Sequence, residues 1–281
     1  MRDKQEQLEW EARAGRLAGF AAWIGAALIV AALAYRVAAL PHGADNVKQF
    51  LPQVNAHKNA FLVSAILTAV GMLAFIPPLL YLYEVTHFRR TELPQVARIL
   101  IFLGPILFAI CTVWFQFRQQ HAADQFLAGA NKANKHAEDL LRNSTTAVAG
   151  LSLGASIATG LATVLVSLNA MRAGLLSRFM GVLGIILGAL FVLPLIASPI
   201  IQLFWLIALG ALYLNLWPGT GRGPAWESGE AEPWPSAPSR FAPRPAEEED
   251  HAEPEAATEP EPASAPNPNT SRKRRKKKAR R

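Results

Sequence analysis

The chain of 281 residues has a single cysteine, Cys111, and this scarcity excludes several kinds of site. One thiol cannot form an intrachain disulfide, a redox-active CxxC pair or a zinc centre built from several thiolates. Cys111 also lies inside a long apolar run, so we interpret it as a small side chain that faces lipid or the protein core.

Clusters of catalytic or metal-binding side chains are also scarce. Glu84 and His87 have the i, i+3 spacing of a metal-binding helix, but no second copy accompanies them on that side of the predicted bundle. Four histidines fall in the predicted outer loops near acidic residues, namely His42, His57, His121 and His136. Their spacing is not that of a tight ligand set, although imidazole and carboxylate together can hold zinc. We therefore predict no enzyme, no cofactor and no metal site, with an outer-loop metal or pH-sensing site as the alternative.

Basic charge is sparse until the C-terminus, where it is concentrated. The formal net charge is +7, yet the last ten residues alone carry nine basic side chains. These are Arg272, Lys273, Arg274, Arg275, Lys276, Lys277, Lys278, Arg280 and Arg281. Elsewhere acidic residues slightly outnumber basic ones, so the positive net charge is a property of this basic block.

Long apolar runs are what the sequence has in abundance, since hydrophobic residues make up 51% of it. A membrane-spanning helix needs about 20 apolar residues, because about 30 Å of hydrocarbon is crossed at about 1.5 Å per residue. Six runs meet or approach this length: residues 17–40, 60–84, 99–117, 147–171, 179–197 and 200–217. We predict an all-α fold, a polytopic transmembrane bundle of six helices at 17–217, preceded by a cytoplasmic segment at 1–16.

The loops between these runs predict an orientation. Lys and Arg are about twice as dense in the loops that share a side with the N-terminus, which favours that side as cytoplasmic. The first run is longer than the apolar part of a cleaved signal peptide, so we expect it to remain as an anchor. We predict a bacterial plasma-membrane protein with both termini in the cytoplasm.

The outer loop at 118–145 has a helical pattern of its own. Five small or apolar residues recur at intervals of three or four, which places them on one helix face: Phe126, Ala130, Ala133, Ala137 and Leu140. We predict an amphipathic helix that lies on the bilayer or extends the third span, with a partner-binding helix as the alternative.

After residue 217 the composition changes to Pro, Gly, Ala and Glu, which cannot bury a core. We predict a disordered cytoplasmic tail at 218–281 that is first acidic and then polybasic. The basic block at 272–281 is predicted to bind anionic lipid headgroups. Nucleic acid, which attracts the same charges without base specificity, and an inert solvated tail are the alternatives.

Glycine and proline within the apolar runs predict how the helices pack. Gly150 with Gly154, and Gly184 with Gly188, have the small-xxx-small spacing that lets membrane helices approach, within one chain or between copies. Prolines interrupt three runs, at Pro77, Pro78, Pro105 and Pro194, and broken helices can line a transport site.

Polar side chains within the runs are interpreted as structural. Arg36 lies near the end of its run, where it can reach the membrane surface. Asn169, Gln116 and Gln202 are interpreted as groups that pack between helices or lie at the interface. The sequence places no ionisable residue in mid-membrane, and such a residue would be expected of an ion-coupled transporter.

Two stretches of the sequence stand out: "NAMRAGLLSRFMGVLGIILGALFVLP" at 169–194 and "PAWESGEAEPWPS" at 224–236. They resemble multi-pass membrane proteins of actinobacteria that are related to the DUF4386-like integral membrane family. In those proteins a short cytoplasmic "RxGLLxR" turn links two spans, as Arg172 to Arg178 does here. The resemblance implies a six-helix membrane protein and no activity. Taken with the residues, it leads us to predict a non-enzymatic membrane protein, with a small-solute transporter or channel subunit as the alternative.

Overall fold

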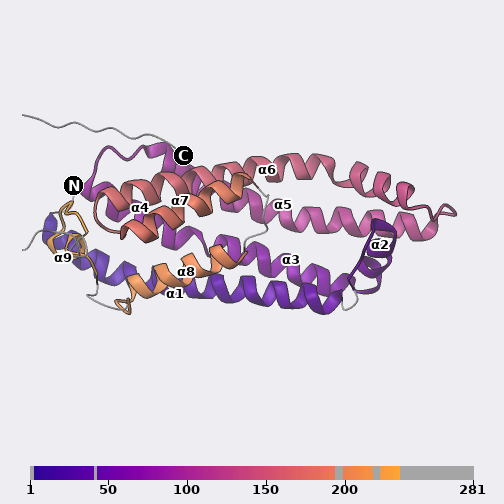
Figure 1. Cartoon of the computed structure of the whole chain (residues 1–281), viewed down its shortest axis with the longest axis horizontal. Helices are drawn as coiled ribbons and strands as arrows, with labels where there is room; N and C mark the ends of the chain where they lie inside the picture. The colour runs from indigo at the N-terminus through magenta and orange to yellow at the C-terminus, as the bar shows by residue number, and fades with distance from the viewer. Residues whose placement is uncertain (1–2, 41–42, 194–198, 218–221, 235–281) are drawn as a thin grey trace, which may run out of the picture. The chain divides into compact units, whose positions relative to one another are not determined.

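The structure is a computed structural model that describes residues 3–40, 43–193, 199–217 and 222–234. Every regular element in these ranges is a helix (Figure 1). The helices are α1 (Lys4–Ala39), α2 (Val47–Ala56), α3 (Lys58–Leu73), α4 (Ile76–Arg89), α5 (Gln95–Ala128), α6 (Asn134–Arg172), α7 (Arg178–Val192), α8 (Pro199–Tyr213) and α9 (Ala225–Ser228). The prediction of an all-α membrane-type bundle is therefore confirmed.

Four long helical segments form the frame of the bundle. They are α1, α3 with α4, α5 and α6, and each is long and apolar enough to cross a membrane. We call the end where α1 begins the near end, and the end that holds α2 and the α5–α6 connection the far end (Figure 1).

The two remaining apolar helices, α7 and α8, are shorter. Each has 15 residues, which at about 1.5 Å per residue is about 22 Å and less than a full crossing. Both lie in the near half of the bundle, α7 along α6 and α8 along α1 (Figure 1). Four of the six predicted spans are thus present as long helices, and six complete crossings stay a prediction.

Glycine lets the short helices approach the long ones closely. A Cβ atom on Gly188 of α7 would lie 2.6 Å from the carbonyl oxygen of Gly160 on α6, so only glycine fits there without a shift. On α8, a Cβ atom on Gly210 would lie 3.1 Å from the oxygen of Gly19 on α1. The predicted packing role of Gly184 and Gly188 is confirmed within the chain, because both meet α6 or α8.

The other predicted pair, Gly150 and Gly154, has a different environment. Both residues are exposed on α6, and a Cβ atom added to either would meet nothing within 4 Å. A packing role for this pair inside the described chain is therefore wrong.

Proline accompanies an interruption of the helix between α3 and α4, whereas α5 is not interrupted at its proline. Pro77 and Pro78 occupy the first turn of α4, where a missing N–H costs little. The buried Phe75 at this break contacts Phe191 and Trp205, with ring centroids 6.1 and 5.9 Å away. α5 continues through Pro105, so the predicted interruption there is wrong, and Pro194 lies outside the described residues.

The outer loop differs from the predicted amphipathic helix at 118–145. α5 extends to Ala128 and α6 starts at Asn134, so the third span is extended and no single helix carries residues 126–140. Phe126 and Ala137 are 2% and 0% exposed, because both join a far-end cluster with α1, α2 and α3. Of the two predicted arrangements, the extension of the third span is therefore the one described, up to Ala128, and this segment packs in a core.

The prediction that residues 218–281 are disordered is wrong for residues 222–234. α9 packs on the near end, where Trp226 is 5% exposed and its indole N–H donates to the Leu175 carbonyl at 2.9 Å. Arg222 stacks on the Trp226 ring and donates to the Tyr213 carbonyl. Two tryptophans, Trp226 and Trp234, supply the apolar area that the rest of this stretch lacks.

A buried ion pair lies beneath this segment. The Arg89 guanidinium donates to both carboxylate oxygens of Glu11, at 2.7 and 3.0 Å, and the two side chains are 0% and 4% exposed. Arg89 also donates to the Ala225 carbonyl at 2.9 Å, and Gln7 donates to Glu11 at 3.0 Å. α1 starts at Lys4 and is continuous, so its first turns pack with the bundle, and the cytoplasmic position predicted for residues 1–16 stays a prediction.

At the surface of the near end, Lys4 donates to Glu230 at 2.8 Å. This hydrogen bond and the ammonium charge hold the pKa of the Glu230 carboxyl below its usual value. The pair is exposed and contributes little to stability.

We predict that Glu11→Gln lowers the stability of the bundle strongly, by about 3–5 kcal/mol, because it leaves the Arg89 charge buried without a carboxylate. Glu92→Gln is the matched control, since Glu92 pairs with Arg90 at the same end but is 76% exposed, and it should cost at most about 1 kcal/mol. The measurement is thermal unfolding of both variants in detergent. Equal Tm values for the two variants would show that the buried pair is not a stabilising contact.

Candidate functional site

Two adjoining cavities lie between the long helices, on the far side of the α7–α8 pair. Their volumes are about 280 and 440 Å³, within or close to the range of about 300–1,000 Å³ typical of small-molecule sites. They share walls from α1, α3, α5 and α7, formed by Arg36, Ser64, Thr68, Phe108 and Phe191. The near-end core, which contains the buried residues of α4, α7, α8 and α9, and the far-end cluster are separate clusters of buried apolar residues.

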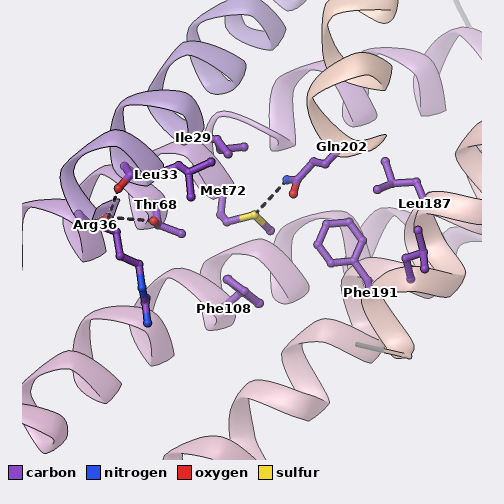
Figure 2. Close-up of a pocket in the computed structure, with 12 residues that line it drawn as sticks. Ile29, Leu33, Arg36, Thr68, Met72, Phe108, Leu187, Phe191 and Gln202 are labelled. Atoms are coloured by element: carbon purple, nitrogen blue, oxygen red, sulfur yellow. Dashed lines mark hydrogen bonds between the residues drawn. The ribbon is translucent and has the colours of Figure 1, made fainter. Parts of the chain in front are cut away.

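The smaller cavity has mostly apolar walls (Figure 2). Its apolar lining comes from α1, α3, α5 and α7 and includes Ile29, Leu33, Met72, Phe108, Leu187, Leu190 and Phe191. Gln202 reaches it from α8, and its amide N–H donates to the Met72 sulfur at 3.5 Å. This part of the site is suited to a hydrocarbon group.

The larger cavity has more polar groups. It is lined by side chains of α3, α5 and α6 that include Ser64, Thr68, Thr112, Gln116, Gln119, Ser152 and Ser156. Its apolar walls include Phe61, Ala65, Phe115 and Leu153, and the protein's only cysteine, Cys111, also lines it. Cys111 is buried, so the prediction of a core-facing thiol is confirmed.

Three hydroxyl donors of this wall are already engaged. Ser64 donates to the Ala32 carbonyl, Thr68 to the Ser64 carbonyl and Thr112 to the Phe108 carbonyl, each at 2.8 Å. These bonds link the α1 and α3 backbones or close one helical turn. These three hydroxyl groups can serve a ligand only as acceptors, whereas the Ser152 and Ser156 hydroxyl groups have no hydrogen bond to a described residue.

Gln116 is different, because its side-chain amide is an unused donor. The residue is 4% exposed, and its Nε2 atom has no hydrogen-bond partner in the part of the chain that the structure describes. Leaving a buried donor unpaired costs about 1–3 kcal/mol, so such a group calls for an explanation. A ligand with an acceptor atom would satisfy it.

Arg36 is the one charged residue among the described residues that line the two cavities. It belongs to the last turn of α1, and no ion pair or side-chain hydrogen bond joins it to a described residue. Figure 2 shows its side chain extended, with the guanidinium group away from the α1 backbone. Its five N–H donors are therefore available to a ligand.

The predicted metal candidates do not come together. No group of three or more His, Cys, Asp or Glu side chains that could hold a metal ion occurs among the described residues. Glu84 instead pairs with Arg98 at 3.4 Å, and His87 stacks on Tyr83 with ring centroids 5.6 Å apart. His121 bonds Gln125 at 3.0 Å. His42 and the basic block at 272–281 lie outside the described residues.

Three residues that the sequence predicts to be interface or packing groups line the cavities in the structure: Arg36, Gln116 and Gln202. A signal for the site was present in the sequence. Polar residues recur at i, i+4 on three apolar helices, at 64 and 68, 112 and 116, and 152 and 156. This spacing places each pair on one helix face, although it does not show that the three faces meet.

We predict that the larger cavity is open to small reagents. In a Cys111→Ala background, Ser152→Cys should react with a small thiol reagent, because Ser152 lines the cavity. Ser167→Cys on the same helix should react only after unfolding, because Ser167 is 0% exposed within the near half. Mass spectrometry of labelled protein in membranes gives both rates, and equal rates would contradict an accessible cavity.

Comparison of the chain with models of protein families, with curated proteins and with solved structures finds no match. The resemblance to the DUF4386-like integral membrane family stays a prediction.

Proposed function

We propose that this protein is a non-enzymatic, multi-pass protein of the bacterial plasma membrane that binds a small lipophilic molecule in the cavity between α1, α3, α5 and α6. The observation that carries this proposal is a mainly apolar cavity between the helices, one of whose lining residues has an unpaired buried donor, the Gln116 amide. Among the described residues the Ser167 hydroxyl and His87 Nδ1 are also buried without a hydrogen-bond partner, and Gln116 differs from them because it lines a cavity.

The distribution of charge supports a membrane position for these helices. No charged side chain occurs at 17–35 in α1 or at 99–117 in α5, and each stretch is about 28 Å long as a helix. Arg16 and Arg98 border these stretches at the near end, and Arg36 and Arg118 at the far end. In this placement the cavity lies in the far half of the bilayer.

We infer that the near end faces the cytoplasm, because Arg and Lys are denser in its connections. Both termini are then cytoplasmic. The α7–α8 pair lies on the same side, and two further full crossings by it stay a prediction. In this orientation the cavity belongs to the outer half of the bilayer.

A small-solute transporter or channel subunit is the alternative use of the same cavity. A transporter must also open a path to the near side, where the described chain has a closely packed aromatic cluster of Tyr81, Tyr213 and Trp226. This arrangement favours binding from the bilayer over passage through the bundle. Solute flux in liposomes that contain the purified protein separates the two functions.

We predict that a neutral, photoreactive fatty alcohol labels the cavity walls at α5 and α6 when the protein is in nanodiscs. Ser152→Trp should abolish this labelling by filling the cavity. Gly154→Trp is the matched control two residues away, since it projects into open space and should leave the labelling intact. Mass spectrometry locates the labelled residues, and equal labelling of the two variants would contradict the proposed function.

The basic block at 272–281 supports a second proposal, that the C-terminus binds anionic lipid. It contains nine basic side chains, and each contributes up to about 1 kcal/mol near an anionic leaflet. Such an attraction is screened by salt and needs no folded site. Nucleic acid is the competing polyanion.

We predict that the full chain in neutral-lipid nanodiscs binds anionic vesicles at low salt, that binding weakens at high salt, and that a chain ending at Thr270 does not bind. Flotation with anionic and neutral vesicles measures this, with RNA as competitor. Equal binding to both vesicle types, or complete transfer to RNA at physiological salt, would rule out the lipid proposal.

A further inference from the structure

We propose that the cavity ligand is an amphiphilic anion with one carboxylate or phosphate head, bound by Arg36 and the Gln116 amide, and one hydrocarbon chain in the smaller cavity. The inference rests on the proposed function and specifies the ligand class of the same site. It follows from which hydrogen-bonding groups of the cavity are already used and which are not.

The strongest unused groups of the cavity are donors, although Gln119, Ser152 and Ser156, which could donate or accept, are also without a described hydrogen bond. The hydroxyl groups of Ser64, Thr68 and Thr112 donate hydrogen bonds to backbone carbonyls. The Gln116 Nε2 group, in contrast, has no acceptor among the described residues. Arg36 adds a guanidinium group with no described carboxylate partner. The complementary head is therefore an acceptor with negative charge.

The geometry of the guanidinium group further limits which head groups of a ligand fit the site. Arginine presents a planar fork of N–H groups that matches two oxygens of a carboxylate or a phosphate. A cationic head would be repelled by Arg36. A neutral alcohol offers one oxygen, so it can use only part of the donors that Arg36 and Gln116 present.

The rest of the site fits a hydrocarbon chain. The smaller cavity begins at Arg36, which it shares with the larger one, and continues along Ile29, Leu187 and Leu190. These walls offer few polar groups to a sugar or a peptide, whereas a hydrocarbon chain gains from burial there. The polar groups thus gather toward one part of the site and the apolar groups toward the other.

The position of Arg36 on α1 fits a ligand that comes from the bilayer. It follows the charge-free stretch at 17–35, so its guanidinium lies near the membrane boundary in the proposed placement. An amphiphile in that leaflet carries its head at the same depth. A free fatty carboxylate and a lipid phosphate monoester share this chemistry, and the experiment below separates them.

The test uses three photoreactive probes with the same hydrocarbon chain: a fatty acid, a fatty alcohol and a lysophosphatidate. Each labels the protein in neutral-lipid nanodiscs at a pH where the acids are ionised, and the half-saturating concentration is measured at the cavity walls. For the wild type we expect the better of the two anions to saturate at a concentration about tenfold or more below that of the alcohol. The anion with the lower value identifies the source of the ligand.

Variants of Arg36 and Gln116 test whether these residues cause the preference for the anionic probes over the alcohol. Arg36→Gln and Gln116→Met should each reduce the anion preference, R36Q to the level of the alcohol, while the alcohol still labels the same walls. Arg36→Lys keeps the charge and should retain part of the preference. Arg142→Gln is the matched control, since Arg142 also lies toward the far end but is 77% exposed and pairs with Asp139, and it should change nothing.

Each result decides the proposal. An anion that labels no better than the alcohol in the wild type, or a preference that persists in R36Q, overturns it. If the alcohol labels the cavity walls with a half-saturating concentration no higher than that of the anions, only the proposed ligand class is wrong. If no probe labels these walls, the proposed binding function fails as well.

Discussion

The close approach of α7 and α8 to the long helices is the contact on which the rest of the structure depends. Gly160 with Gly188 and Gly19 with Gly210 let backbones meet where any larger side chain would force a shift. The pair therefore packs inside the near half of the bundle and supplies Leu187, Leu206 and Leu209 to its core. Because these helices have 15 residues each, the long helices continue past them, and the cavities lie in that region.

The near and far halves of the bundle are stabilised by different contacts. The near half is closed by the Glu11–Arg89 pair and by α9, whose Trp226 covers the connection that follows α6. Breaking one partner of such a pair is costly, so this end is held in one arrangement. The far half depends on apolar contacts among α2, α5 and α6, with the cavities between the two. The near half is thus closely packed, and the cavities lie toward the far half, as the proposed binding of a ligand from one leaflet requires.

Some polar groups of the cavity form hydrogen bonds within the protein, and others remain available to a ligand. Hydroxyl groups on α3 and α5 close hydrogen bonds to nearby carbonyls, which membrane helices tolerate well. Arg36, the one charged residue of the lining, and Gln116, with its buried unpaired amide, are among the exceptions, and they come from different helices. Their convergence on one space is what distinguishes this cavity from a packing defect between helices.

The sequence by itself determined that the chain is helical and where its long helices lie, because apolar runs of about 20 residues have few other stable forms in lipid. It also indicated that Gly184 and Gly188 allow close packing, and that Cys111 is buried. Only the tertiary structure decided that α7 and α8 are short, that residues 222–234 pack on the near end, and that Arg36 and Gln116 share a cavity. The physical reason is that composition and periodicity describe one helix at a time. The order at Trp226, the pairing of Glu11 with Arg89 and the unpaired Gln116 amide each depend on contacts between segments far apart in the chain.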